Sequence, residues 1–390
     1  MSTELAPATD FDVALRAAVD LAYLAPSSHN SQAWGLAVAR SPEAHRRLGA
    51  ALERATGQAA PSPSARRVVL ALDRARELNA LRDHRVEMYL SCGAYLHLLL
   101  EVLRLRGWGA ARVMWNEALR VDWLQPVAPP RRWLPLAVIE LSPRPRADRG
   151  RLIELTRLVA RRTTNRAPYR GAPPADALLA APAPLPQESS APRPPVETHV
   201  LTDRAKIASI GAFVAANAAI DFAHPKAWRE THRFLRWSSG DHVEDGLPIE
   251  QLYGPLSPAR KLWHRVTLAP PVLSRLAHVG HATRLAEQLG ALVRDSPALA
   301  VVSLAAERPT LSETVDGGAA LMQLWLRATA AGAALHPISA ILQHPDLRVR
   351  FQRDHDLPGR VVFFSRLGYP ASAFPPAPRR RDPWSSVATL

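Results

Sequence analysis

Residues 26–34 read Pro-Ser-Ser-His-Asn-Ser-Gln-Ala-Trp, a polar stretch that lies between two regular patterns. Residues 13–24 before it form an apolar run with helical spacing, and residues 35–39 after it form a short apolar run typical of a strand. A turn between a helix and a strand brings hydroxyl groups, side-chain amides and free backbone N–H groups together. The stretch therefore predicts a binding place for an anion or a flat polar ring.

An internal repeat appears when the chain is aligned with itself. Two apolar helices and two apolar strands match in one ungapped register, and each helix is followed by a glycine suited to a left-handed C-cap. The aligned positions are Gly93, Gly107 and residues 136–139 in the first copy, and Gly318, Gly332 and residues 361–364 in the second. We therefore expect two copies of one α+β unit, at 1–150 and 151–390.

The second copy contains a long insertion. Its first two strands are far apart in the sequence, whereas those of the first copy are close. The four strands are expected at 34–38 and 68–72 in the first copy and at 196–200 and 298–302 in the second. The extra residues fall within about 218–290. Two interpretations stay open: a lid or substrate-selecting wall beside a binding site, or a helical excursion that covers a sheet face.

A second motif lies far from the first, where residues 162–166 read Arg-Thr-Thr-Asn-Arg. Paired guanidinium groups bind a phosphate through charge-assisted, often bidentate hydrogen bonds. The hydroxyl of Thr164 can add a further bond. Three consecutive arginines at 379–381 supply another basic cluster near the end of the chain. These groups predict a phosphate site.

Together the two motifs resemble those of the nitroreductase family, whose flavin-contacting turn reads A-P-S-x-x-N-x-Q-P-W and whose phosphate clamp reads R-x-S/T-x-R. Family members are normally homodimers with FMN at the subunit interface. Here the turn occurs only in the first copy and the clamp only in the second. The chain thus resembles the fused, Acg-like subfamily. The resemblance implies an α+β fold of two tandem nitroreductase-like halves that form an intramolecular pseudo-dimer, each a mostly antiparallel sheet flanked by helices.

The resemblance also implies the site residues. An N–H aimed at flavin N5 stabilises reduced flavin electrostatically, and by the family match this is the backbone N–H of Ser339. The chain departs from the family pattern at Ala33, which replaces a proline, and carries His29 at a variable position. The implied FMN-binding residues are Pro26, Ser27, Ser28, Asn30, Gln32, Arg162, Thr164, Arg166, Arg379 and Arg381.

Three functions remain open at this point. The first is an FMN-dependent oxidoreductase in which NADPH or NADH reduces the flavin, which then reduces a small conjugated acceptor such as a nitroaromatic or a quinone. The second is a flavin-dependent dehydrogenase or oxidase that tailors a small organic metabolite. The third is a non-enzymatic protein that sequesters FMN. The motifs do not separate them.

The composition argues against nucleic-acid-binding, metal-binding and membrane-spanning classes of protein. The formal net charge is +14, but the arginines are scattered and no zinc-finger or RNA-binding signature accompanies them, so we expect no nucleic-acid partner. Cys92 is the only cysteine, and the histidines of 218–290 show no metal-ligand spacing, so we expect no metal. No apolar run approaches the ~20 residues of a membrane span, and residues 1–12 lack a signal-peptide core. We expect a cytoplasmic monomer that acts on a small molecule.

Overall fold

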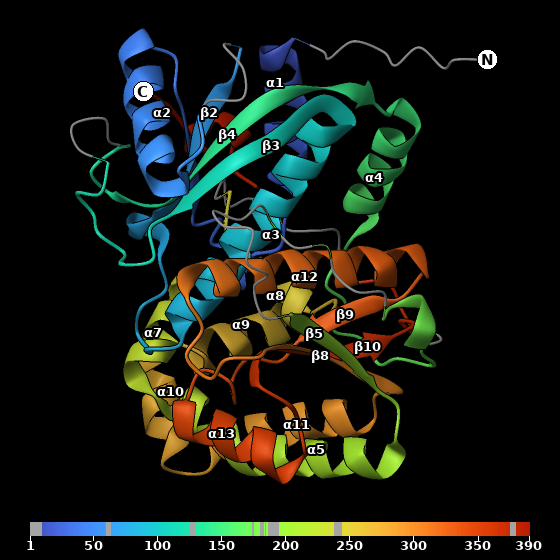
Figure 1. Ribbon diagram of the computed structural model, residues 1–390. Coiled ribbons are helices and arrows are strands. Elements are labelled where there is room, and N and C mark those ends of the chain that lie inside the picture. Colours follow the sequence, from blue (N-terminus) through green and yellow to red (C-terminus); the bar gives the residue numbers. More distant parts are fainter. Residues whose placement is uncertain are drawn as a thin grey trace.

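The computed structural model describes residues 10–59, 64–124, 129–173, 175–179, 183, 185, 195–237, 244–374 and 380–390. Two sheets, one built mainly from each half of the chain, lie on opposite sides of a pair of long helices (Figure 1). These central helices are α3 (His84–Leu105) and α12 (Leu311–Ala330). The predicted α+β architecture of two tandem halves is confirmed.

The first sheet has five strands among the described residues, and all its pairings are antiparallel except that of β11 with β1. In sheet order the strands are β11 (Val387–Thr389), β1 (Trp34–Val38), β2 (Arg66–Asp73), β4 (Trp133–Ala147) and β3 (Arg106–Trp115). The helices of this half are α1 (Phe11–Ala22), η1 (Ser28–Asn30), α2 (Pro42–Thr56), η2 (Arg74–Arg76), α3 and α4 (Arg149–Arg161).

The second sheet has four strands in the described part of the chain, and all of them pair antiparallel. In sheet order they are β5 (Val196–Leu201), β8 (Ala298–Leu304), β10 (Arg360–Gly368) and β9 (Ala334–Pro337). Matched to the first sheet, β5, β8, β10 and β9 take the places of β1, β2, β4 and β3. The sheet order therefore reproduces the internal repeat found in the sequence.

Helix ends are defined by local chemistry. The side chain of Thr310 accepts a hydrogen bond from the backbone of Glu313, whose side chain accepts from Thr310 in return, so a capping box begins α12. Ser41 accepts from the backbone N–H of Ala44 at the start of α2, and Gly57 ends that helix with a φ of 66°.

The two central helices cross at a pair of glycines. A Cβ on Gly93 of α3 would lie 2.0 Å from the carbonyl oxygen of Val315, and a Cβ on Gly318 of α12 would lie 2.1 Å from that of Leu90. Only glycine permits such a close approach of two backbones. Gly93 and Gly318 are aligned in the repeat, so the crossing joins equivalent points of the two halves.

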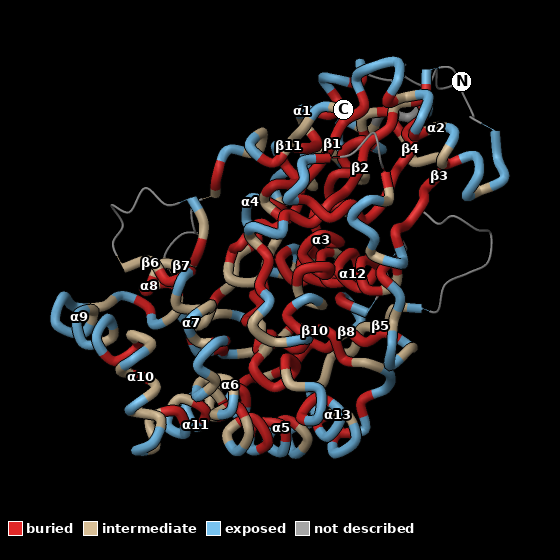
Figure 2. Tube along the Cα trace, turned by 90° about the vertical axis from the view of Figure 1, so that its left-hand side faces the viewer, coloured by how far each residue is buried: buried red, intermediate tan, exposed pale blue. Residues whose placement is uncertain are grey.

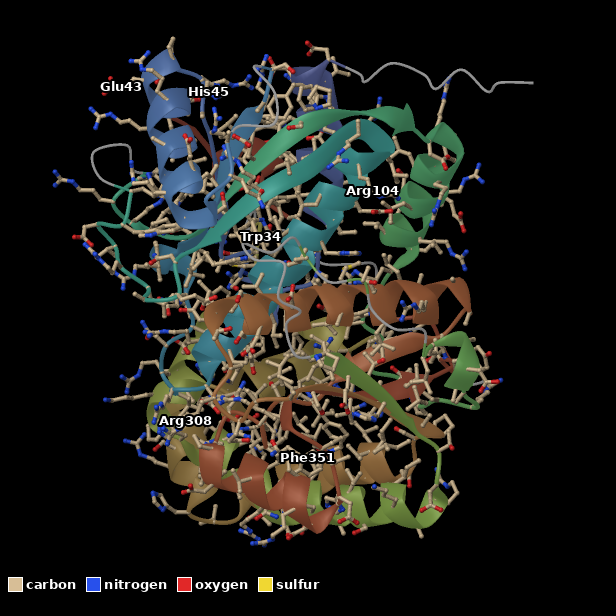
Figure 3. The ribbon with its side chains drawn as sticks, in the orientation of Figure 1. Trp34, Glu43, His45, Arg104, Arg308 and Phe351 are labelled. Atoms are coloured by element: carbon tan, nitrogen blue, oxygen red, sulfur yellow. The ribbon has the colours of Figure 1, made fainter. Side chains whose placement is uncertain are left out.

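The apolar cores lie on both sides of this helix pair. In the first half, the ring of Trp34 stacks on that of Tyr95 with centroids 5.1 Å apart. In the second half, Phe351 packs against Phe364 with centroids 5.3 Å apart. Trp34 and Phe351 are labelled in Figure 3. Figure 2 shows that α3 and α12 are buried at the centre of the molecule.

The insertion is mainly helical where the structure describes it. It leaves the second half after α5 (Arg204–Asn217), returns through α11 into β8, and carries α9 and α10 at one outer edge of the molecule (Figure 2). Its elements are α6 (Ala219–Ala223), α7 (Pro225–Arg233), β6 (Leu235–Arg236), β7 (Leu247–Pro248), α8 (Ile249–Tyr253), α9 (Pro258–Thr267), α10 (Pro270–Ala277) and α11 (His281–Arg294). The remaining elements are η3 (Ala175–Ala177), α13 (Pro345–Asp354) and η4 (Pro383–Ser386).

The end of the chain departs from the simple picture of two separate halves. The last strand, β11, pairs with β1 in the first sheet, although we expected residues 151–390 to form the second half.

Two helical stretches, His84–Leu105 and Arg204–Ala223, are long and apolar enough to span a membrane by length and composition. The first of these is the central helix α3, and 72% of its apolar window is buried inside the protein.

Candidate functional site

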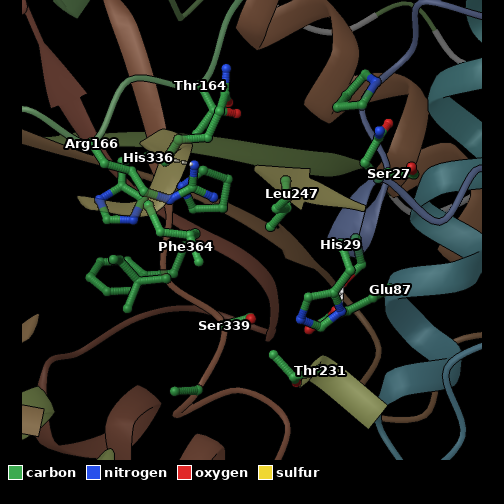
Figure 4. A pocket seen from close by; sticks show the side chains of 18 of the residues that line it. Ser27, His29, Glu87, Thr164, Arg166, Thr231, Leu247, His336, Ser339 and Phe364 are labelled. Carbon is green, nitrogen blue, oxygen red and sulfur yellow. Dashed lines mark hydrogen bonds between the residues drawn. The ribbon is translucent and has the colours of Figure 1, made fainter. Parts of the chain in front are cut away.

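One cavity of about 480 Å³ lies where the two halves and the insertion meet (Figure 4). The turn after α1, the clamp after α4 and the segment after β9 all contribute to its lining. The predicted residues that line it are Pro26, Ser27, Ser28, Asn30, Arg162, Thr164, Arg166 and Ser339. The structure therefore brings together two motifs that are more than a hundred residues apart in the sequence.

The turn has an unusual backbone. His29, Asn30 and Gln32 have φ values of 51°, 52° and 52°, in the left-handed region that non-glycine residues rarely adopt. The hydroxyl of Ser27 accepts a hydrogen bond from the backbone N–H of Gln32 at 3.0 Å and so closes the turn. Strained backbone of this kind is found preferentially at functional sites.

The two amide side chains of the turn hold the insertion. Asn30 Nδ2 donates to the carbonyl oxygen of Gly246 at 3.1 Å, and Gln32 Nε2 donates to that of Glu244 at 3.0 Å. We expected both amides at the flavin. Asn30 does line the cavity, whereas Gln32 is fully buried behind it and does not.

The clamp leaves α4 and approaches the second sheet. Thr164 forms a parallel bridge with Leu335, the residue before His336 in β9. Arg162 lies over the ring of Trp325, with 4.8 Å between the guanidinium carbon and the ring centroid, and Arg166 Nη1 donates to the carbonyl oxygen of Gln251. Both guanidinium groups line the cavity, as the resemblance implies.

A third arginine completes this basic group. Arg380 lines the cavity, whereas the guanidinium of Arg381 points away and donates to the backbone oxygens of Gln32 and Trp34, at 2.7 and 3.4 Å. Arg381 therefore supports the turn from behind rather than facing the cavity. Arg379 lies outside the described residues. Of the two arginines that the family match implies, Arg381 does not line the cavity and Arg379 stays a prediction. A run of three arginines in sequence gives no means of choosing among them.

These three cations have no carboxylate partner among the described residues. Burial lowers the pKa of Arg162 to about 9, with a further contribution from the charge of Arg380, and burial lowers the pKa values of Arg166 and Arg380 to about 10. Arg162 Nε and Arg380 Nη1 are buried without a hydrogen-bond partner. A cluster of desolvated cations with donors to spare is suited to a multiply charged anion.

Ser339 and His336 lie beside this cluster. The backbone N–H of Ser339 donates no hydrogen bond within the described chain, so it can serve a bound molecule. His336 Nδ1 accepts from Arg366 Nη1 at 3.0 Å, which places the imidazole proton on Nε2. Burial and the charges of Arg166 and Arg366 hold the pKa of His336 well below its usual value, so the ring is neutral.

A polar group that we did not predict from the sequence lies across the cavity from the arginines. Figure 4 shows Glu87, from α3, next to His29. Ser28 Oγ donates to Glu87 Oε2 at 2.5 Å, and Gln343 Nε2 donates to Glu87 Oε1 at 2.7 Å. The His29 ring stacks on Phe234 with centroids 6.0 Å apart. Glu87 lies in the first turn of a mostly apolar helix, where an acidic residue is not distinctive in sequence.

The insertion supplies much of the remaining wall. Its contribution is mostly apolar: Phe222, Trp228, Leu235, Leu247, Leu252, Leu268, Leu285 and Leu289. Of the two interpretations of the insertion, the wall beside a binding site agrees with this placement. A site with three cations, a carboxylate that forms no ion pair and an apolar wall can hold an elongated molecule that is anionic at one end and flat and apolar at the other.

The chain is similar to one known protein along nearly its whole length and to another along part of it. It is 27% identical over 391 residues to a Serratia protein described as "Probable NAD(P)H nitroreductase PigM", an alignment that covers 97% of this chain and 94% of that protein. It is 28% identical over 168 residues to an uncharacterized protein of Mycobacterium tuberculosis, across 43% of this chain and 23% of the other. No protein-family model matches the chain.

Solved structures also align with parts of the chain. The FMN-dependent nitroreductase NfnB of Mycobacterium smegmatis in complex with NADPH has a TM-score of 0.34 and 16% identity, over 57% of this chain and 90% of that one. A nitroreductase with bound FMN from Bacteroides fragilis has a TM-score of 0.31 and 16% identity, over 58% and 93%.

The similarity to the Serratia protein extends over nearly the whole of both chains and agrees with the resemblance that the two motifs indicate. The chain is thus similar to a probable NAD(P)H nitroreductase, and its two halves are joined in tandem.

Proposed function

We propose that the protein is an FMN-dependent oxidoreductase of the nitroreductase type, in which NADPH or NADH supplies electrons and a small conjugated molecule accepts them. The observation that carries this proposal is the group of three guanidiniums at one cavity, of which Arg162 is buried and Arg166 and Arg380 are half-buried. Without a bound anion, the desolvation and mutual repulsion of these cations destabilise the folded protein, and a dianionic phosphate would offset both effects.

The residues present fit FMN. Arg162, Arg166 and Arg380 would hold the phosphate, with the hydroxyl of Thr164 as a further donor. The free backbone N–H of Ser339 would serve the flavin ring. When bound, FMN accepts a hydride from a nicotinamide and passes electrons to the acceptor. The protein contributes binding, orientation and a cavity that limits access of water.

The class of acceptor follows from the wall of the insertion. Phe222, Trp228 and several leucines offer a face suited to flat apolar molecules, and no arginine or lysine of the described insertion lines the cavity. We therefore propose nitroaromatic or quinone-like acceptors. The monomeric state and a cytoplasmic location stay predictions from the sequence.

The direct test is the absorption spectrum of the freshly purified protein, followed by anaerobic mixing with NADPH and with NADH. We expect about one flavin per chain and loss of the yellow absorption band with at least one donor. A protein with bound flavin that neither donor bleaches would contradict the proposal and favour sequestration. Bleaching by an organic substrate alone would favour the dehydrogenase or oxidase function.

Removing one phosphate partner gives the first prediction. Arg162→Ala should purify with less than about a tenth of the wild-type flavin content, because a charge-assisted hydrogen bond to a dianion contributes about 1.5–3 kcal/mol. The flavin content is measured from the ratio of visible to protein absorbance. The matched control is Arg161→Ala, which removes the neighbouring exposed arginine and should keep full occupancy. Equal flavin content in the two variants would rule out Arg162 as a phosphate ligand.

A further inference from the structure

The cavity contains a carboxylate that the phosphate group does not need. Two acidic side chains line it in the described part of the chain, Glu87 and Asp221. Asp221 Oδ1 lies 3.3 Å from His344 Nε2, whereas Glu87 forms no ion pair with any described residue. A carboxylate in a cavity without a cationic partner is costly unless donors satisfy it.

Glu87 is held in place from both halves of the chain. Ser28 Oγ, from the turn, donates to Oε2 at 2.5 Å, and Gln343 Nε2, from the segment after β9, donates to Oε1 at 2.7 Å. Gln343 Nε2 also donates to Ser339 Oγ at 3.1 Å, so the same amide connects Glu87 to the serine proposed to face the flavin ring. Each carboxylate oxygen has two lone pairs, so both retain capacity for a donor from a bound molecule.

The surroundings of Glu87 favour a flat, uncharged partner. His29, stacked on Phe234, flanks the carboxylate, and burial lowers the pKa of His29 to about 4, so its ring is neutral at physiological pH. Figure 4 shows Glu87 and His29 on one side of the cavity, with Arg166 and His336 on the other. The nearby insertion residues Leu235 and Leu247 add apolar surface to the lining. An anionic substrate would be repelled by Glu87. A strongly hydrated substrate would have to give up its water at this apolar surface, which costs free energy.

We propose that Glu87 is a specificity-determining residue that accepts a hydrogen bond from an O–H or N–H group of an uncharged, conjugated substrate. The substrate class is thereby narrowed from any conjugated acceptor to those that carry such a donor next to the ring system. This inference rests on the proposed function for the identity of the site, and its test does not depend on flavin. A site that hydrogen-bonds an O–H or N–H group of its ligand discriminates strongly against an analogue that lacks this group.

The test uses two probes that differ by one hydroxyl group, 4-nitrobenzyl alcohol and 4-nitrotoluene. Their binding to the full chain, as purified, is measured by equilibrium dialysis without nicotinamide, using the absorbance of the nitro group. We expect the wild-type protein to bind the alcohol at least about tenfold more tightly than the toluene, because hydrogen bonds to charged acceptors are stronger than those between neutral groups. In Glu87→Gln the preference should fall to about twofold or less.

The matched control is Glu101→Gln, the same chemical change on the same helix at a half-exposed residue that pairs with Arg104. It should keep the wild-type preference. Thermal unfolding of each variant shows whether it folds, and its flavin content shows whether the phosphate site is intact. Neither measurement depends on the hydrogen bond proposed for Glu87. Equal affinity of the wild-type protein for the two probes would overturn the inference, as would an unchanged preference in a folded Glu87→Gln. A protein that purifies without flavin but discriminates between the probes would contradict the proposed function alone.

Discussion

At the scale of single residues, His29 shows how the cavity controls charge. Its backbone is left-handed and its ring stacks on Phe234. Burial lowers its pKa from the usual 6.5 to about 4, although the neighbouring carboxylate of Glu87 acts in the opposite direction. The folded protein therefore binds fewer protons at this site than the unfolded chain between these two pH values, and its stability rises with pH across that window.

The second prediction follows from the direction of this pH dependence of stability. As the pH falls from about 6.5 to about 4, His29 should remove on the order of 2 kcal/mol from the free energy of unfolding, because the unfolded chain takes up a proton that the folded site resists. His29→Gln should lose correspondingly less stability over the same window. Urea unfolding at pH 7 and at pH 4.5 measures the difference. His278→Gln, at an exposed histidine, should follow the wild-type pH dependence.

Single residues also mark the limit of the sequence prediction. The clamp arginines and the serines of the turn could be placed at the cavity because both motifs resemble those of the nitroreductase family. Arg380 and Arg381 could not be separated, since their roles depend on which side of the chain each faces in the folded protein. Glu87 carried no motif at all, and only the crossing of α3 past the turn brings it to Ser28.

At the scale of elements, the insertion is fastened across the cavity by the segment 244–246. Asp245 lies between the guanidiniums of Arg76, from the first half, and Arg236, from β6. The side chain of Asp245 is 16% exposed, and Glu230 of α7 adds a second link by accepting from the backbone N–H groups of Asn79 and Ala80. The apolar wall is therefore tied to the turn rather than only to the second sheet.

The third prediction concerns this link. Asp245→Asn should lower the free energy of unfolding by on the order of 2 kcal/mol, because two partly buried guanidiniums lose their shared carboxylate. Chemical denaturation, followed by tryptophan fluorescence, measures the loss. Asp122→Asn makes the same change in an exposed pair with Arg120, whose side chains are 62% and 63% exposed, and should cost little. Equal losses in the two variants would show that Asp245 does not hold the insertion.

The elements themselves were largely predictable. The strands expected at 34–38, 68–72, 196–200 and 298–302 all exist, because short apolar runs between breakers leave few alternatives. The insertion was expected as a block, and a wall beside the site was one of two interpretations that the sequence left open. Its contacts with the turn join residues more than 200 positions apart, and neither periodicity nor composition encodes such contacts.

At the scale of the whole molecule, the glycine crossing decides how the halves fit together. The Cβ contacts at Gly93 and Gly318 are with backbone atoms, which cannot move aside as a side chain can. Gly317, next to it on α12, faces instead the flexible ends of Leu304 and Leu90, at 3.2 Å. Two adjacent glycines in one helix thus differ in what surrounds them.

The fourth prediction uses this contrast. Gly318→Ala should destabilise the protein by about 3 kcal/mol or more, because the central helices must move apart to admit a methyl group. Gly317→Ala should change stability by less than about 1 kcal/mol, since alanine also favours the helix. Thermal and urea unfolding of the two variants, which have identical composition, measure the difference directly. A mild effect at Gly318 would mean that the helices are not in backbone contact.

The path of the chain end has a consequence for any attempt to divide the protein. Arg380 lies between β10, a strand of the second sheet, and β11, a strand of the first, so both sheets position this cation. The first half expressed alone would lack Arg380 and the strand that covers the edge at β1. A protein cut between the halves would therefore have to bring both pieces together again to restore the site.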